Sequence, residues 1–68
     1  MTDTHGNTER LRYAREHGYD VMYAETQRTG YATWTYSDGQ RVTLPTFGSL
    51  EGLQYYAKRH RFAVIYVD

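Results

Sequence analysis

Histidine is the commonest metal ligand and acid–base catalyst among side chains, and this chain has three: His5, His17 and His60. No two of them stand four residues apart, the spacing at which one helix presents two imidazoles to a single zinc ion. His17 and His60 fall instead at the ends of predicted helices, where the helix dipole favours an imidazole. The sequence therefore predicts no metal site.

Carboxylates and hydroxyls form no catalytic pattern either. The carboxylates Asp20, Glu25, Asp38 and Glu51 lie in separate predicted elements, so their spacing does not pair them as general acid and base. Ser37 and Ser49 stand at a predicted turn and a predicted helix cap, which are ordinary places for serine. No glycine pattern for binding a phosphate or a dinucleotide is present. We therefore expect neither enzyme activity nor a cofactor.

Basic and aromatic side chains are the remaining candidates for function. The chain has eight tyrosines, and arginine supplies all but one of its basic residues; both types are common at protein interfaces. Lys58, Arg59 and Arg61 cluster at the end of the second predicted helix, beside Tyr55. This cluster is either a solvated helix end or a contact for an acidic partner surface or for phosphates. The residues predicted to bind a partner are Tyr31, Arg28, Tyr55, Lys58, Arg59, Arg61 and Tyr66.

Length and charge limit the classes of partner. Sixty-eight residues are enough for one domain, which we place at residues 7–68 after a polar, flexible tail at residues 1–6. Eight basic and eight acidic residues cancel, so the chain lacks the general attraction of a nucleic-acid or membrane binder. There is no cysteine and no apolar run of membrane-spanning length. We expect a cytoplasmic protein that does not bind a membrane.

The first half of the chain reads as a helix followed by a strand. Asn7 or Thr8 is expected to cap a short helix, and Gly18 is expected to end it in a left-handed conformation. Residues 19–26 alternate in the manner of a strand.

The middle of the chain predicts a β-hairpin that turns at Asp38 and Gly39, because glycine adopts a positive φ angle without steric cost and aspartate tolerates it. The two strands span residues 31–36 and 41–44. A small chain needs its largest side chain in the core, so we expect Trp34 and Tyr36 to face the helices. Tyr31 would then lie on the open face of the sheet.

The last third predicts a helix capped by Ser49 and a final strand at residues 62–67. The final strand is nearly all apolar, which is typical of a strand buried on both faces. The sequence therefore predicts a single small α+β domain with the order α-β-β-β-α-β. We expect a mostly antiparallel four-stranded sheet in the strand order 3-2-1-4, with both helices on one face.

Three functions follow from these features. The favoured one is a small protein-interaction module without catalytic activity. Free-standing chains of this kind are often accessory proteins of phages or mobile elements, such as the anti-CRISPR class, which inhibit a host complex by binding it. The alternative is a nucleic-acid (RNA) binding module that uses the arginine clusters and exposed tyrosines. A small enzyme is the least favoured. A homodimer through the last strand is also considered, because Ile65, Tyr66 and Val67 would offer an unpaired edge.

Overall fold

The computed structural model describes residues 6–27 and 30–67 of the 68-residue chain. Arg28 and all but the last residue of the predicted tail lie outside the described residues. The elements follow the predicted order and are α1 (Asn7–His17), β1 (Asp20–Glu25), β2 (Ala32–Ser37), β3 (Gln40–Thr43), α2 (Leu50–Arg59) and β4 (Phe62–Tyr66).

The helix ends follow the predicted signals with one exception. Gly18 ends α1 with a φ angle of 69°, and its backbone N–H donates to the Ala14 carbonyl. At the start of α2, the Ser49 hydroxyl accepts a hydrogen bond from the Gly52 N–H at 3.1 Å. The exception is the start of α1, where Gly6 is the cap residue and no side chain caps the helix. The Asn7 side chain is used elsewhere, as described below.

The hairpin turns at the predicted residues. Asp38 and Gly39 both have positive φ angles, 53° and 77°, which is the requirement of the tight type I′ turn that matches the twist of two antiparallel strands. Ser37 pairs with Gln40 on either side of this turn, so the register of β2 against β3 follows directly from it.

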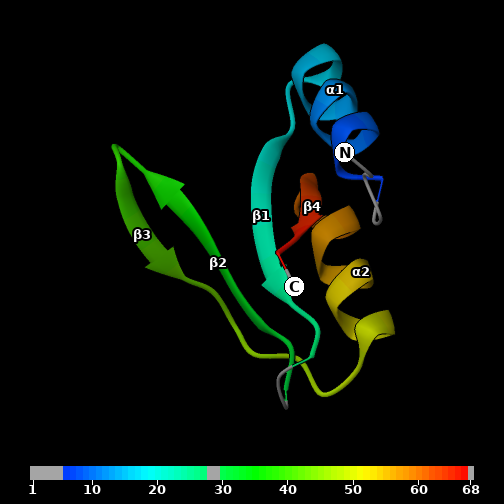
Figure 1. Ribbon diagram of the computed structural model, residues 1–68, viewed down its shortest axis with the longest axis vertical. Coiled ribbons are helices and arrows are strands. Elements are labelled where there is room, and N and C mark those ends of the chain that lie inside the picture. The colour runs from blue at the N-terminus through cyan, green and yellow to red at the C-terminus, as the bar shows by residue number, and fades with distance from the viewer. Residues whose placement is uncertain (1–5, 28–29, 68) are drawn as a thin grey trace.

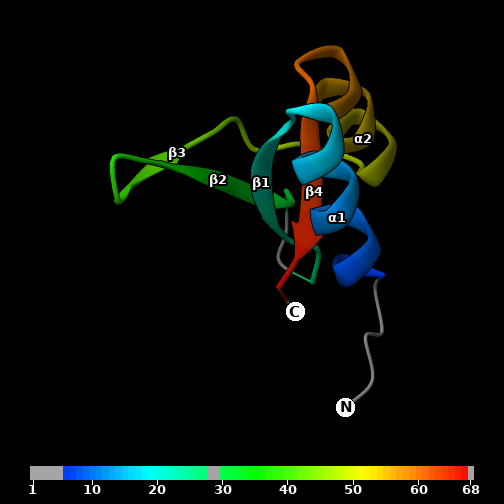
Figure 2. The same cartoon turned by 90° about the horizontal axis from the view of Figure 1, so that it is seen from above.

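The sheet is mixed, with the predicted strand order β3-β2-β1-β4. β1 pairs with β2 and β2 with β3 in antiparallel fashion, whereas β1 and β4 are parallel. Strand β3 is therefore one edge of the sheet and β4 is the other. The hairpin of β2 and β3 extends away from both helices, as the two views show (Figures 1 and 2).

The core lies between α2 and one face of the sheet. Leu53 and Ala57 of α2 pack with a cluster of buried sheet residues, which are Met22, Ala24, Val64 and Tyr66. The register places Thr33 opposite Ala24, so the threonines of β2 share this face and Trp34 and Tyr36 point to the other one. The expected orientation of β2 is therefore wrong, although Trp34 is buried as expected, with 7% of its surface exposed.

Small side chains explain this reversal. The face under α2 is built from Met22, Ala24 and Thr33, and the Thr33 hydroxyl is satisfied by donating to the Pro45 carbonyl at 2.5 Å. A threonine whose hydroxyl finds a partner can be buried at little cost. The bulky rings of β2 then occupy the opposite face.

The two helices do not share a face of the sheet, which corrects the second part of the expected architecture. α2 packs on the side of β4 that carries Val64 and Tyr66, and α1 lies on the other side of β4 (Figures 1 and 2). Ala63 and Ile65, which alternate with Val64 and Tyr66, are buried as well, and so is Ala14 of α1. β4 is thus enclosed on both faces, as its apolar sequence predicts.

Neither helix in the described part of the chain is long and apolar enough to cross a membrane.

Candidate interaction surfaces

The predicted basic cluster is present at the end of α2. Tyr55, Lys58, Arg59 and Arg61 are all exposed there, and 65% of the Tyr55 surface is accessible. The Arg59 guanidinium donates to the Tyr55 hydroxyl at 3.4 Å, one turn earlier on the helix. The exposure of these residues fits both a solvated helix end and a contact site.

The other predicted contact residues lie apart from this cluster. Tyr31 is half-buried and packs against the core cluster, so it does not stand on the open face of the sheet. Tyr66 is buried within the core, and its hydroxyl lies 3.4 Å from the amide nitrogen of Gln54. Both residues therefore serve the packing of α2 on the sheet.

The edge of β4 is occupied at one residue by a side chain from α1. The Asn7 amide nitrogen donates to the Tyr66 carbonyl at 2.9 Å, and the Asn7 side-chain oxygen accepts from the Tyr66 N–H at 3.2 Å. An asparagine amide can make both bonds because it is, like the peptide group, a donor and an acceptor side by side. A second strand could pair at Tyr66 only by displacing Asn7.

An aromatic face, which we define as Tyr23, Trp34, Tyr36 and Arg41, covers the hairpin side of the sheet opposite α2. The Tyr23 ring stacks near the Trp34 ring with centroids 6.0 Å apart, and it meets the Tyr36 ring edge-on at 5.5 Å. The Arg41 guanidinium lies 4.1 Å from the centre of the Trp34 ring, within the range of a cation–π interaction.

The aromatic face is open to solvent at its outer end. Tyr36 exposes 53% of its surface, and a hollow of about 330 Å³ lies beside it, lined in part by Val21 and Tyr23. Trp34 is buried beneath its neighbours, whereas Tyr36 and Arg41 are accessible. The face thus has a rigid aromatic centre and an accessible rim.

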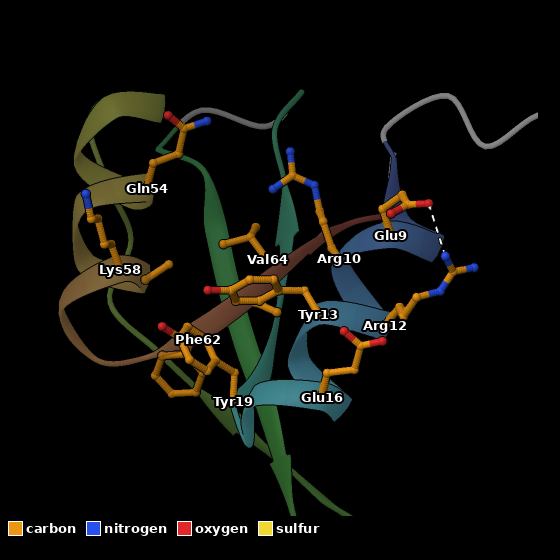
Figure 3. A pocket seen from close by; sticks show the side chains of 12 residues that line it. Glu9, Arg10, Arg12, Tyr13, Glu16, Tyr19, Gln54, Lys58, Phe62 and Val64 are labelled. Atoms are coloured by element: carbon orange, nitrogen blue, oxygen red, sulfur yellow. Dashed lines mark hydrogen bonds and ion pairs between the residues drawn. The ribbon is translucent and has the colours of Figure 1, made fainter.

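A groove of about 660 Å³ separates the two helices at the edge of β4. Figure 3 shows Val64 of β4 at its floor, Tyr13 and Glu16 on the α1 side, and Gln54 and Lys58 on the α2 side.

Tyr13 is the central side chain of this groove. Its ring stacks on His17 at 3.9 Å and meets Tyr19 edge-on at 5.3 Å. The Tyr19 hydroxyl raises the pKa of Tyr13 above its ordinary value, through a hydrogen bond and through charge repulsion. This hydrogen bond ties the Tyr13 hydroxyl to Tyr19 at one end of the groove.

Polar side chains do not gather into a metal centre within residues 6–27 and 30–67, where no group of three or more histidines and carboxylates is close enough to hold an ion. The His17 ring nitrogen lies 3.0 Å from the Tyr13 carbonyl, one turn earlier on α1. The His60 ring packs against Tyr56 with centroids 4.2 Å apart. Both rings thus have local structural contacts at the ends of their helices.

Two of these surfaces were not predicted from the sequence. Tyr23, Tyr36 and Arg41 were assigned to the core or to no site, because the face of β2 was predicted in the wrong orientation. Part of the signal was present in the alternation, because the Asp38–Gly39 turn sets the register of β2 against β3 and so places Tyr36 beside Arg41. The groove depends on the placement of α1, for which the sequence holds no local signal.

Comparisons with protein-family models, with curated proteins and with solved structures find no match for this chain.

Proposed function

We propose that the chain is a small protein-interaction module, without catalytic activity, that binds a protein partner through the aromatic face. The observation that carries this proposal is the position of the largest aromatic side chains of the protein. Trp34 and its neighbours lie on the face of the sheet opposite α2, and the hairpin that carries Trp34 extends away from both helices (Figure 2). Tryptophan, tyrosine and arginine are the residues that most often dominate binding energy at protein interfaces.

The arrangement of Arg41 favours a protein over a nucleic acid as the partner. A nucleobase binds an aromatic side chain by stacking on an accessible ring face, but the guanidinium of Arg41 already lies over the Trp34 ring. The net charge of zero also gives no long-range attraction for phosphates. A protein surface with an acidic rim, in contrast, would meet Arg41 beside an apolar ring cluster.

Inhibition of a host complex by binding, as in phage or mobile-element accessory proteins, is the role for which such a module is suited. An inhibitor of this type needs one stable contact surface and no chemistry of its own. This role remains a prediction from size and composition, and it is secondary to the binding proposal.

The proposal is tested by affinity capture with matched variants. The tagged chain is used to capture proteins from extracts of the organism that encodes it, with nuclease added and with salt raised from about 50 mM to about 200 mM. Tyr36→Ala and Arg41→Glu should each weaken capture of a specific protein at least tenfold, because both residues are exposed on the aromatic face.

Val42→Thr is the control, since Val42 is exposed on the opposite face of the same strand as Arg41. It should capture as the wild type does. Capture that the Tyr36 and Arg41 variants leave unchanged would refute the aromatic face as the contact. Capture that disappears with nuclease or at the higher salt, or that only Arg59→Glu and Arg61→Glu abolish, would favour nucleic acid or the basic end of α2 instead.

A further inference from the structure

The groove beside β4 lies where a further strand of the sheet would pair with β4, between the two helices. β4 is the last strand of the order β3-β2-β1-β4, so one of its sides has no neighbouring strand. In both views the helices lie on the side of β4 away from the hairpin, one helix toward each face of the sheet (Figures 1 and 2). The space between them is the groove of about 660 Å³. Ligand sites in proteins have volumes of roughly 300–1,000 Å³.

Backbone hydrogen-bonding groups face this groove. On the inner side of β4, the Asp20 N–H donates to the Arg61 carbonyl at 3.3 Å, and the Val67 N–H donates to the Ala24 carbonyl at 3.0 Å. Peptide groups alternate in direction along a strand that pairs with a parallel neighbour. Residues 61, 63, 65 and 67 therefore direct their groups toward β1, whereas Phe62, Val64 and Tyr66 direct theirs toward the open side.

Asn7 already acts as a partner for one of these outward positions. Its amide makes both a donor and an acceptor bond to the backbone of Tyr66, which is the pattern that a neighbouring strand would make. The next outward position along β4 is Val64, which lines the groove. The edge is thus closed by a substitute amide at Tyr66, and it borders the groove at Val64, of which 5% of the surface is exposed.

We propose that this groove binds an extended peptide segment of a partner protein, which pairs with β4 at Val64 as a fifth strand. Strand addition of this kind draws its affinity from main-chain hydrogen bonds and its specificity from the pockets for alternate side chains. We favour a single extended segment as the occupant, because a second folded copy would bring its own helices against α1 and α2. The groove lies at the opposite edge of the sheet from β3, so it is separate from the aromatic face and either proposal can fail alone.

The walls define the side chains that the peptide should carry. Successive residues of a strand point to opposite faces, so one set would face α2 and the other α1. The α2 wall presents the small Ala57 and the cation Lys58, whereas the α1 wall presents Tyr13 among charges of both signs, which are Glu9, Arg10, Arg12 and Glu16 (Figure 3). The favoured peptide therefore has a small apolar residue and an acidic residue toward α2, and an aromatic residue toward α1.

The test selects ligands and then locates them. Random heptapeptides displayed on phage are selected against the full chain, and synthetic copies of the selected peptides are titrated into ¹⁵N-labelled protein. We expect the amide resonances of Val64, Ala57 and Tyr13 to shift, and hydrogen exchange at the Val64 amide to slow at least tenfold. Selected peptides that shift only the aromatic face or the end of α2, or selections that yield no binder affecting Val64, would overturn the proposal.

A second test of the groove reverses the charge of a lining residue. Lys58 and Glu16 are both exposed, so substitution of either one leaves the core intact. Lys58→Glu should weaken binding of a selected acidic peptide at least tenfold, and a peptide with a basic residue at that position should regain it. Lys58→Gln should have an intermediate effect. Equal binding of both peptides to wild type and Lys58→Glu would contradict the assigned orientation and the groove with it.

Discussion

Asn7 is the residue whose side chain connects the two ends of the chain. It starts α1, yet its amide is bonded to the backbone of Tyr66, 59 residues later. Because both bonds are partly buried, their loss would leave the Tyr66 N–H and carbonyl poorly solvated. This one side chain therefore fixes the first turn of α1 against the edge of β4.

Replacing Asn7 should measurably destabilise the fold. Asn7→Ala removes two hydrogen bonds, each contributing about 0.5–1.5 kcal/mol, so we expect the free energy of unfolding to fall by about 1–3 kcal/mol. Urea denaturation followed by circular dichroism measures this change. Arg15→Ala, at an exposed position of the same helix, is the control and should change stability by less than about 0.5 kcal/mol. Equal effects of the two substitutions would show that the Asn7 bonds contribute nothing.

At the scale of the elements, α2 is the helix on which the core depends. Leu53 is fully buried against the sheet, whereas Leu50, one turn earlier, exposes 38% of its surface. The same substitution at these two positions therefore separates burial from helix propensity.

We expect Leu53→Ala to cost about 2–5 kcal/mol, the usual range for a buried leucine. A domain of this size has only about 3–5 kcal/mol of net stability, so this variant should be largely unfolded at 37 °C in a thermal melt. Leu50→Ala should lose less than about 1 kcal/mol, because less apolar surface leaves contact. Melting curves that coincide for the two variants would contradict the assigned position of α2.

The elements were predictable from the sequence to a greater extent than their faces. Turn and cap signals are local, and for that reason Asp38, Gly39, Gly18 and Ser49 were assigned correctly. The face of β2 depends on what α2 can cover, which is a tertiary property. The rule that the largest side chain belongs under a helix failed here, because alanines and a satisfied threonine pack under α2 and leave Trp34 on the opposite side.

The predicted contact residues also divide into those set by local sequence, which were placed correctly, and those set by tertiary packing, which were not. The basic end of α2 is a local feature of one helix, and Tyr55, Lys58 and Arg59 are accessible there as expected. Tyr31 and Tyr66 were expected at the surface, but they pack against or within the core. Their positions depend on how the helices meet the sheet, which the spacing of residues in a single sequence does not specify.

For the molecule as a whole, the enclosure of β4 bears on self-association. The helices that flank β4 would meet those of a second copy before two β4 edges came within hydrogen-bonding distance of about 3 Å, and Asn7 already bonds Tyr66. We therefore expect no dimer through the last strand. Light scattering at increasing concentration should give the mass of a single chain, and a dimer that Val64→Pro disrupts would contradict this expectation.

The central claim is that the aromatic face contacts a protein partner, and Trp34 offers a direct probe because it is the only tryptophan of the chain. The chain is labelled with 5-fluorotryptophan, and its single ¹⁹F resonance is followed while the unlabelled captured protein is added. Trp34 lies at the centre of the face beneath Arg41, so we predict that the resonance shifts or broadens in step with binding and does so far less in the Tyr36→Ala variant. A resonance that stays unchanged while the partner saturates the chain would contradict the claim.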